Sequence, residues 1–449
     1  MGLSVVILAA GLGTRMNSDR PKALHVLAGA PLLHHAMTAA ASLEAARIIV
    51  VTGHGAEAVA DAAREFDPAA MIAVQEEQQG TAHAVATAAP ALAGAGGDTV
   101  VLYADTPLVR PETLAAMRAA RDEHDIVVLG FEAADPDRYG RLVVRGDRLE
   151  RIVEFADASE SERAIHLCNS GVVMADTEAL LDLTGRVSRD NAAGEYLLTD
   201  IVALGRARGL SAGVVRCDEA ETLGVNTRAQ LARAEAAFQA RARAAALENG
   251  VTLTAPETVF FAIDTVIGRD ASIGPHVLFG PGVTIESGAE VLGFCHLEGC
   301  HISRGARVGP FARLRAGTEL AEDVRVGNFV EVKNAILDEG AKAGHLTYLG
   351  DARIGARTNV GAGTITCNYD GIAKHVTRIG RDAFIGSDTM LVAPVTVGDG
   401  AWTASGSVIT EDVPAGALAL GRARQVTRPG LAAATRDKLR ARGAASEGG

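Results

Sequence analysis

The feature that most constrains the fold of this chain is a six-residue repeat of aliphatic and aromatic residues in its second half. The repeat runs from Phe261 to Val397, with a one-residue slip at Ile302 and two longer interruptions after it. A period of six fits neither an α-helix nor a β-hairpin. It is typical of a parallel β-helix, in which each hexapeptide forms one flat face of a coil. Three faces complete a coil, so the pattern predicts that Ile273 stacks on Val291.

The first half of the chain alternates short β-rich runs with helical stretches. The predicted strands cover residues 4–9, 47–52, 99–103 and 125–130, and the predicted helices cover residues 32–43 and 56–65. This alternation predicts a Rossmann-like α/β domain with a mostly parallel sheet covered on both faces.

The connection between the two halves is predicted to be a helix. Residues 228–247 are rich in Ala, Arg and Leu and contain neither Gly nor Pro, which favours one long helix. We therefore predict four parts: an α/β domain over residues 1–225, a linker helix over 226–250, a β-helix of hexapeptide repeats over 251–427, and a flexible basic tail over 428–449.

Charge and hydropathy narrow the class of protein. The 449 residues include 43 Lys and Arg against 55 Asp and Glu, a net charge of −12, with no basic block and no apolar run long enough to span a membrane. Binding to nucleic acid or to a membrane surface is therefore not expected. The N-terminus lacks the pattern of a signal peptide, and five scattered cysteines suit reduced thiols. We expect a cytoplasmic enzyme that acts on small molecules.

A glycine-rich loop follows the first predicted strand. Gly11 and Gly13 let the backbone approach a phosphate or a base closely, and Arg15 and Lys22 supply positive charge beside them. The loop lacks the later glycine of a dinucleotide-binding motif and the Gly-Lys-Ser/Thr of a P-loop. Taken alone, it also fits a tight turn between a strand and a helix.

Further polar residues stand where open α/β sheets bind ligands. Asp105 stands two residues after the predicted strand 99–103, at the end of the sheet where ligands bind. A carboxylate that faces polyphosphate there suits Mg²⁺. The alternative role of Asp105 is a helix N-cap before Pro107. The run from Gln75 to Ala82 carries amides, a hydroxyl and a glycine turn suited to the edge of a nucleobase.

These motifs resemble a known family. The segment LAAGLGTRM, the Pro21–Lys22 pair and the YAD before Pro107 are similar to those of sugar-phosphate nucleotidyltransferases. Further motifs narrow the likeness: IVEF with Glu154, CNSG with Asn169, GEYLLTD with Glu195 and Tyr196, and GVNTR with Asn226. Over about residues 4–425 the chain resembles the bacterial bifunctional N-acetylglucosamine-1-phosphate uridylyltransferase/glucosamine-1-phosphate acetyltransferase family.

The resemblance implies roles for the first half, with UTP as co-substrate. The residues that would bind the uridine end are Leu8, Ala9, Ala10, Gly11, Gln75, Gly80 and Thr81. Arg15 and Lys22 would bind the phosphates and are the catalytic residues, and Asp105 and Asn226 would bind Mg²⁺. The residues that would surround the sugar are Tyr103, Gly140, Glu154 and Asn169. Ala104, in the same binding set, and Ala82 stand where the family usually has glycine, so each adds one methyl group near a ligand.

The second half carries chemistry in the interruptions of its repeat. Residues 342–351 include His345, which is suited to accept the proton of an amine that attacks a thioester. The alternative is a hydrogen-bonded histidine on the face of a β-helix. Lys374 falls in a predicted loop after the second interruption, 361–371, where a cation could close over a substrate.

The same family resemblance assigns roles here. His345 would be the catalytic base; Arg315, Lys333, Tyr348 and Asn359 would bind glucosamine-1-phosphate; and Ala362, Asn368, Tyr369, Ser387, Ser405 and Arg422 would surround acetyl-CoA. Ser405 departs from the alanine common at its position. The resemblance also implies left-handed coils and a homotrimer whose acyltransferase sites lie between neighbouring subunits.

We therefore predict a bifunctional enzyme that acetylates glucosamine-1-phosphate and then makes UDP-N-acetylglucosamine. Two alternatives are a monofunctional nucleotidyltransferase with a structural or regulatory β-helix, and a non-enzymatic nucleotide-sugar binder. The pairs Cys295–His296 and Cys300–His301 match no common zinc spacing, so no zinc site is expected there.

Overall fold

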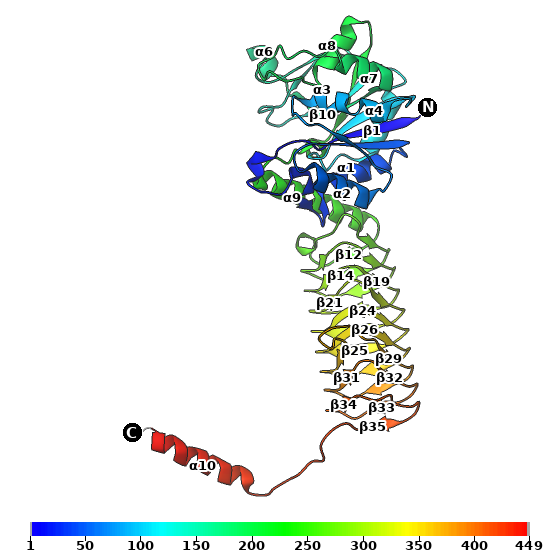
Figure 1. Cartoon of the computed structure of the whole chain (residues 1–449), viewed down its shortest axis with the longest axis vertical. Helices are drawn as coiled ribbons and strands as arrows, with labels where there is room; N and C mark the ends of the chain where they lie inside the picture. Colours follow the sequence, from blue (N-terminus) through cyan, green and yellow to red (C-terminus); the bar gives the residue numbers. More distant parts are fainter. Residues whose placement is uncertain (1, 447–449) are drawn as a thin grey trace. The chain divides into compact units, whose positions relative to one another are not determined.

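The computed structural model describes residues 2–446, with side chains described to residue 442. Its contacts divide the chain into two compact units, one comprising the residues up to Ile267 with Pro275–Val283, and the other Gly268–Gly274 with the residues from Thr284 onward. Figure 1 shows the α/β architecture of the first unit and the stacked short strands of the second. The division into four parts stays a prediction.

The first unit is built on one sheet with strand order β11-β7-β10-β6-β1-β4-β5. The strands are β1 (Leu3–Leu8), β4 (Arg47–Thr52), β5 (Met71–Val74), β6 (Asp98–Tyr103), β7 (Ile126–Glu132), β10 (Leu167–Asp176) and β11 (Ala212–Cys217). Strand β10 runs antiparallel to both neighbours, and the other pairs are parallel. The predicted Rossmann-like, mostly parallel sheet is thus confirmed. A hairpin of β8 (Arg141–Arg145) and β9 (Arg148–Val153) joins β10.

Helices cover both faces of this sheet, so its strands are buried on both sides. Val5 and Ile7 of β1 enter one core with the first group of helices, α1 (Leu32–Ala41), α2 (Ala56–Phe66) and α5 (Pro111–Ala120). Val6 and Leu8 enter the opposite core with the second group, α3 (Thr81–Thr87), α7 (Thr177–Thr184) and α8 (Asp200–Ala207). This burial explains why β1 reads as a continuous apolar run rather than an alternating one.

The predicted linker helix is α9 (Arg228–Glu248), and it belongs to the first unit. The Thr227 side chain caps its first turn by accepting the N–H of Gln230. The first unit also contains the short helices α4 (Ala89–Leu92) and α6 (Glu160–Arg163), the strands β2 (Val26–Leu27), β3 (Ala30–Pro31), β12 (Thr252–Leu253), β13 (Val266–Ile267) and β15 (Leu278–Phe279), and 3₁₀ turns at Thr14–Met16, Lys22–Leu24, Glu219–Thr222 and Pro256–Thr258.

The second unit is a parallel β-helix of very short strands. One row runs β14 (Ser272–Ile273), β17 (Glu290–Val291), β20 (Arg307–Val308), β23 (Arg325–Asn328), β25 (Lys342–His345), β27 (Asn359–Val360), β30 (Phe384–Ile385), β33 (Trp402–Thr403) and β35 (Leu418–Ala419). The other faces are formed by β16 (Thr284–Ile285), β18 (His296–Leu297), β19 (Cys300–Ile302), β21 (Arg313–Leu314), β22 (Thr318–Leu320), β24 (Glu331–Leu337), β26 (Tyr348–Ile354), β28 (Ile365–Cys367), β29 (Thr377–Ile379), β31 (Met390–Val392), β32 (Val395–Val397) and β34 (Val408–Ile409).

The hexapeptide repeat sets the register of this β-helix. Ile273 pairs with Val291 on the next coil, as predicted, and both side chains are buried. In most of the two-residue strands the second residue is buried and the first is more exposed, as in Arg307–Val308; in β33 the buried residue is Thr403, and Trp402 is exposed. The helix α10 (Leu431–Ser446) follows the last coil in sequence and lies in the predicted basic tail.

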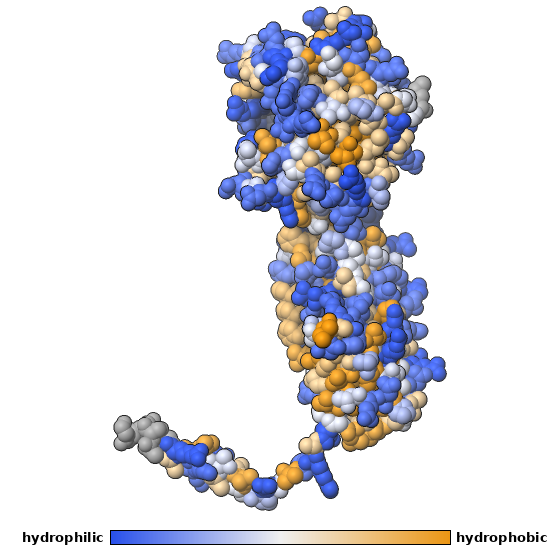
Figure 2. All heavy atoms as spheres, in the orientation of Figure 1, coloured by the Kyte–Doolittle hydropathy of each residue, from blue (hydrophilic) through white to orange (hydrophobic). Residues whose placement is uncertain are grey.

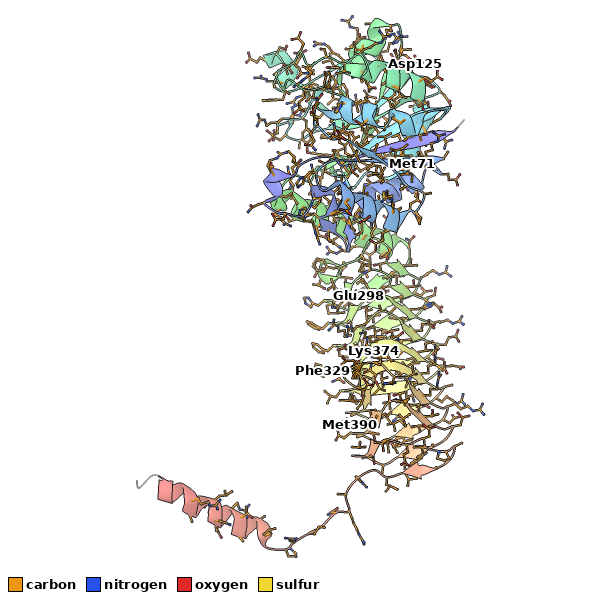
Figure 3. The ribbon with its side chains drawn as sticks, in the orientation of Figure 1. Met71, Asp125, Glu298, Phe329, Lys374 and Met390 are labelled. Carbon is orange, nitrogen blue, oxygen red and sulfur yellow. The ribbon has the colours of Figure 1, made fainter. Side chains whose placement is uncertain are left out.

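Three phenylalanines form what we call the aromatic ladder: Phe294, Phe311 and Phe329. Each takes a left-handed backbone conformation, with φ of 61°, 57° and 56°, which is rare for bulky residues. The neighbouring rings stack, with centroids 4.9 Å apart for the first pair and 5.3 Å for the second. Figure 3 shows Phe329 at the edge of the stacked strands.

Candidate active sites

A cavity of about 260 Å³ opens at the carboxyl ends of β1 and β6. It is lined by eleven of the predicted nucleotide-site residues: Leu8, Ala9, Ala10, Gly11, Lys22, Gln75, Gly80, Thr81, Tyr103, Ala104 and Asp105. Gln78 and Glu195 also line it. Residues from distant parts of the sequence therefore meet where parallel strands end, which is where ligands bind in open α/β sheets.

The turn that carries Gln75 and Gly80 is held in one conformation. The buried Gln75 amide donates to the carbonyl of Gly80 (3.2 Å) and contacts His83 Nδ1 at 3.0 Å. Gly80 has φ of 119°, and a side chain there would collide with the backbone of Tyr196. Only glycine fits this position, so the loop is pre-formed beside the cavity.

Lys22 forms hydrogen bonds with both predicted metal ligands, Asp105 and Asn226. Its ammonium lies 2.5 Å from Asp105 Oδ2 and 3.1 Å from Asn226 Oδ1, and the backbone N–H of Val225 donates to the Asp105 carbonyl at 2.8 Å. Two oxygens from separate segments thus converge on one cation. Asp105 is not a helix cap, because the following helix α5 begins after Arg110.

The predicted sugar residues Gly140, Glu154 and Asn169 lie together. The Asn169 N–H donates to the Gly140 carbonyl at 2.8 Å, and a Cβ on Gly140 would lie 3.5 Å from Glu154 Oε2. Thr199 donates to Glu154 at 3.2 Å. Tyr103 and Asn169 line a small cavity that Thr199 also lines.

Burial shapes the electrostatics around these sugar residues. It raises the pKa of the Glu154 carboxyl, with smaller contributions from Asp200 and Asp157, while the Thr199 hydrogen bond acts in the opposite direction. Burial also raises the pKa of Tyr103, assisted by the negative charges of Asp105 and Glu154. The Tyr103 hydroxyl therefore stays protonated and available as a hydrogen-bond donor.

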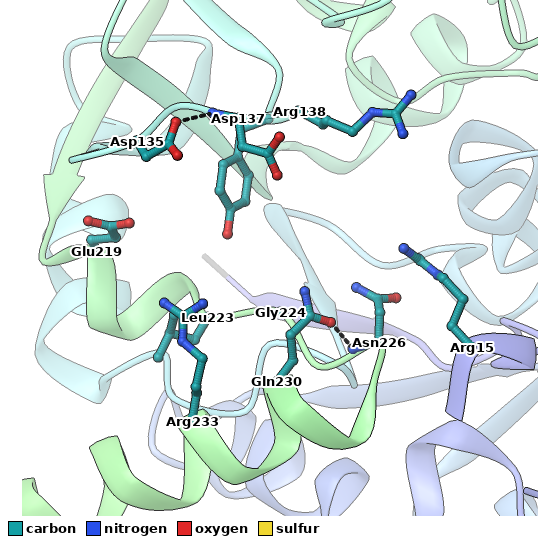
Figure 4. A pocket seen from close by; sticks show the side chains of 11 residues that line it. Arg15, Asp135, Asp137, Arg138, Glu219, Leu223, Gly224, Asn226, Gln230 and Arg233 are labelled. Atoms are coloured by element: carbon teal, nitrogen blue, oxygen red, sulfur yellow. Dashed lines mark hydrogen bonds between the residues drawn. The ribbon is translucent and has the colours of Figure 1, made fainter. Parts of the chain in front are cut away.

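Arg15 lines a different cavity from Lys22. This second cavity, of about 440 Å³, is bordered by Arg15, Asn226, Gln230 and the loop around Tyr139, and Figure 4 shows its side chains. Asn226 connects the two cavities, because it lines the second while its side chain accepts a hydrogen bond from Lys22, which lines the first.

In the β-helix, the predicted base has a partner that sequence reasoning missed. The exposed His345 places Nδ1 2.6 Å from Asn328 Oδ1 on the preceding coil. An amide oxygen only accepts, so the contact fixes the proton on Nδ1 and leaves Nε2 with its lone pair. Asn328 and His345 are paired in register between β23 and β25.

Lys333 of β24 lies close to two other cations, Lys374 and Arg315. A side-chain hydrogen-bonding contact with Lys374 lowers the pKa of Lys333, and the positive charges of Lys374 and Arg315 lower it further. Arg315 also pairs with Glu331 at 2.9 Å. Figure 3 labels Lys374 on this unit. Lysines this close favour an anion between them.

Two other predicted sugar-phosphate residues lie on different rows. Tyr348 of β26 is in register with Glu331 of β24, the strand that carries Lys333. Asn359 lies on β27, in the row of His345, where it pairs with Lys342. The described contacts thus join Arg315, Lys333 and Tyr348 but leave Asn359 on another face.

The predicted acetyl-CoA residues follow successive coils. The Ala362 carbonyl accepts from Asp388 N–H (2.7 Å), the Ser387 carbonyl from Gly406 N–H (2.8 Å), and the Ser405 carbonyl from the Arg422 guanidinium (2.8 Å). Asn368 donates to the buried Asp351 at 2.5 Å, and Tyr369 is 61% exposed. Sequence reasoning missed Asp351, which Asn334 also binds at 2.5 Å.

The described part of the chain has neither disulfide bonds nor a cluster of metal-ligating side chains. All five cysteines are free. Among the described residues no three His, Cys, Asp or Glu side chains gather as a metal site. Over residues 2–446, none of the helices combines the length and the apolar character needed to cross a membrane.

Comparisons with known proteins find relatives that match both halves of the chain. Residues 5–167 match the family model of a MobA-like NTP transferase domain. The "Bifunctional protein GlmU" of Cereibacter sphaeroides is 70% identical over 445 residues, 99% of this chain and 98% of that protein. Proteins of the same name from Paracoccus denitrificans and Jannaschia sp. are 63% and 61% identical, each over 98% of this chain and over 98% and 97% of those proteins. The chain therefore belongs to the bifunctional GlmU family, the uridylyltransferase/acetyltransferase family that its motifs resemble.

Proposed function

We propose that the second unit acetylates glucosamine-1-phosphate from acetyl-CoA and that the first unit then transfers uridylyl from UTP to the product, forming UDP-N-acetylglucosamine. The observation that carries the first unit's assignment is the convergence of Asp105 and Asn226 on one cation beside a cavity lined by the nucleotide motifs. The relatives are named bifunctional and this chain matches nearly their whole length, so a monofunctional nucleotidyltransferase with a structural or regulatory β-helix gains no support.

Uridylyl transfer requires positioning rather than a protein nucleophile. A phosphate oxygen of N-acetylglucosamine-1-phosphate attacks the α-phosphorus of UTP, a new P–O bond forms, and the bond to pyrophosphate breaks. Gln75, Gly80 and Thr81 bind the uracil and ribose, while Gly140, Glu154 and Asn169 hold the sugar. Lys22 and Arg15 offset the negative charge that develops on the phosphates.

Mg²⁺ fits this site. The donors are a carboxylate and an amide oxygen, the ligand types that Mg²⁺ prefers, and both already face a single positive charge, that of Lys22. Asp105 and Asn226 would hold the ion, which would supply further neutralisation of phosphate charge.

Acetyl transfer uses His345 as the base. The amine of glucosamine-1-phosphate attacks the thioester carbonyl of acetyl-CoA, its proton passes to His345 Nε2, and the CoA thiolate leaves. Asn328 is the positioning residue that orients the imidazole. Arg315, Lys333 and Lys374 bind the substrate phosphate, which relieves the repulsion that lowers the pKa of Lys333. Tyr348 and Asn359 would contact the sugar, and Ala362, Asn368, Tyr369, Ser387, Ser405 and Arg422 would surround the cofactor.

The chain would work as a homotrimer in the cytoplasm. The aromatic ladder supports the assembly, because its rings are 51%, 45% and 55% exposed and the next residue of the column, Leu346, is 61% exposed. Leu346 directly follows His345, so a second copy that covers the ladder would also approach the acetyl-transfer site. Figure 2 shows apolar residues gathered along an edge of the stacked strands.

Paired assays test the division of labour. His345→Ala should lower acetyl-CoA consumption with glucosamine-1-phosphate by at least about a hundredfold and leave pyrophosphate release from UTP within twofold of wild type. Asp105→Ala should do the reverse. If the wild-type chain releases no CoA, or if either variant loses both activities while still folded, the proposed division is wrong.

A further inference from the structure

A buried carboxylate of the β-helix binds two asparagine side chains from the neighbouring coils. Asp351 is 8% exposed, and its two oxygens accept hydrogen bonds from Asn334 Nδ2 and Asn368 Nδ2, each at 2.5 Å. Asn334 directly follows Lys333, which is proposed to bind the substrate phosphate. Burying a carboxylate costs free energy unless hydrogen bonds replace those with water. Two neutral amides replace them here.

The turn that carries Asp351 does not require a carboxylate. Asn334 and Asp351 adopt a left-handed backbone conformation, with φ of 46° and 48°, which asparagine and aspartate tolerate better than most residues. Gly317, on which Asn334 packs, adopts φ of 79° with no side chain at all. The backbone can therefore turn here without an acid, and the hydrogen bonds of the carboxylate need a separate explanation.

The carboxylate of Asp351 fixes the direction of the Asn368 amide. A carboxylate only accepts hydrogen bonds, so it holds the Nδ2 group of Asn368 and leaves Oδ1 turned away from it. Among the residues that the structure describes, no group donates to this Oδ1, and the atom is not sealed from solvent. Asn368 therefore presents a free hydrogen-bond acceptor in a fixed orientation.

This acceptor lies beside residues that are proposed to bind glucosamine-1-phosphate. A Cβ on Gly350 would collide with the Tyr348 hydroxyl and would lie 2.8 Å from Asn368 Nδ2, so the hydroxyl and the amide flank one point of the backbone. Thr366 fixes this point, because its hydroxyl accepts from the N–H of Gly350 (2.8 Å) and donates to its carbonyl (3.0 Å). Gly350 is also in register with Lys333 on the preceding coil.

We infer that Asp351 is a positioning residue for acetyl transfer, which holds the Asn368 amide so that its Oδ1 accepts a hydrogen bond from the amine of glucosamine-1-phosphate. This inference rests on the acetyl-transfer function proposed above. The protonated amine carries only donors. One of its protons passes to His345 Nε2, and an acceptor on a second N–H directs the nitrogen lone pair toward the thioester carbon of the cofactor. Asp351 itself contacts no substrate and acts through Asn368.

Exchange of the charge between positions 351 and 368 tests the inference, with acetyl transfer to glucosamine-1-phosphate measured on the full-length chain. Asn368→Asp sets two carboxylates against each other, so the side chain at 368 turns away and kcat should fall at least about tenfold, while the KM for acetyl-CoA stays within about twofold. Adding Asp351→Asn should restore kcat to within about threefold of wild type. The new amide donates to the carboxylate at 368, whose other oxygen again faces the substrate.

Asn334→Asp is the matched control, because it places the same repulsion on the other oxygen of the same carboxylate. Asn334 is exposed, so its side chain can turn into solvent, and kcat for acetyl transfer should stay within about threefold of wild type. Thermal unfolding followed by circular dichroism checks that each variant is folded.

An equal loss of acetyl transfer in Asn334→Asp overturns the inference, because Asp351 would then only hold the turns together. A loss confined to the KM for acetyl-CoA also overturns it, since the acceptor would then meet the cofactor. If Asn368→Asp alone does not fold, the double variant decides, because its three side chains pair again without like charges. A folded double variant without acetyl transfer overturns the inference. A wild-type chain that transfers no acetyl group refutes the proposed function instead.

Discussion

At the scale of single residues, Lys22 holds the place that a metal ion would use. Its ammonium contacts both Asp105 and Asn226, and its side chain is only 15% exposed. A divalent cation that binds these two oxygens must displace the ammonium, so lysine and metal compete for the same ligands.

We therefore expect Lys22→Met to bind Mn²⁺ about tenfold more tightly than wild type in the absence of nucleotide, because a competing hydrogen-bonded charge is removed. Electron paramagnetic resonance of free Mn²⁺ measures the affinity directly. Uridylyl transfer should fall in the same variant, because Lys22 is also proposed to bind phosphate. An equal or weaker Mn²⁺ affinity would mean that Lys22 does not compete with the metal.

A second residue-scale prediction concerns the dependence of stability on pH. Burial raises the pKa of Glu154 in the folded chain. A carboxyl with a raised folded-state pKa stabilises the fold when protonated, and this contribution is lost as the pH rises through that pKa. At a pH above that pKa the charge of Glu154 is therefore a net cost, and at alkaline pH Glu154→Gln should raise the unfolding temperature of the first unit.

This advantage of Glu154→Gln should shrink as the pH falls toward about 4, near the pKa of glutamate in unfolded chains. Calorimetric unfolding at several pH values measures the difference. The amide can still accept the hydrogen bond from Thr199, so that contact is matched between the two proteins. A pH-independent difference would show that the charge of Glu154 is not its cause.

At the scale of elements, the hexapeptide repeat predicts the β-helix and its stacking but not the surroundings of His345, the proposed catalytic base. The pair Ile273 and Val291 follows directly from three repeats per coil. Asn328 and His345 are 17 residues apart, as are all the paired residues of β23 and β25, whereas Ile273 and Val291 are 18 apart, so the length of a coil varies along the β-helix. A shift of one residue changes which side chains face each other, so the partner of His345 could not be derived from the period.

The register of β23 on β25 leads to a prediction about acetyl transfer. Asn328→Ala removes the acceptor that keeps the proton on His345 Nδ1, so part of the population adopts the wrong tautomer. We expect kcat for acetyl transfer to fall about tenfold to hundredfold with little change in either KM. Asn328→Asp, which keeps the acceptor, should restore most of the rate. An unaffected rate in Asn328→Ala would remove its positioning role.

Part of the proposed nucleotide site could also be predicted from the sequence. Parallel strands bring their carboxyl ends to one edge, so motifs such as those of Gly11 and Asp105 could be placed together before any coordinates. The loop that carries Arg15 has no such regular pattern, and Arg15, expected near Lys22, lines a separate cavity from it.

At the scale of the whole molecule, the aromatic ladder connects the proposed assembly with activity. A left-handed backbone at Phe311, with φ of 57°, would be adopted at lower cost by Gly or Asn. A phenylalanine there destabilises the isolated chain and exposes its ring, which is 45% accessible. Stacking on Phe294 and Phe329 leaves this part of the ring uncovered, and a second copy that covers the ladder would bury it.

Phe311→Asn tests this connection, because asparagine tolerates the left-handed conformation and the β-helix of the single chain should be preserved. We expect the variant to sediment as a smaller species than the wild type and to lose at least about tenfold in acetyl transfer, since the ladder adjoins His345 through Leu346. Uridylyl transfer, measured on the same sample, should stay within twofold and serves as the control for folding. A variant that keeps its full assembly and its acetyl transfer would show that the ladder is not an interface. Loss of assembly with unchanged acetyl transfer would show instead that each acetyl-transfer site is complete within one chain.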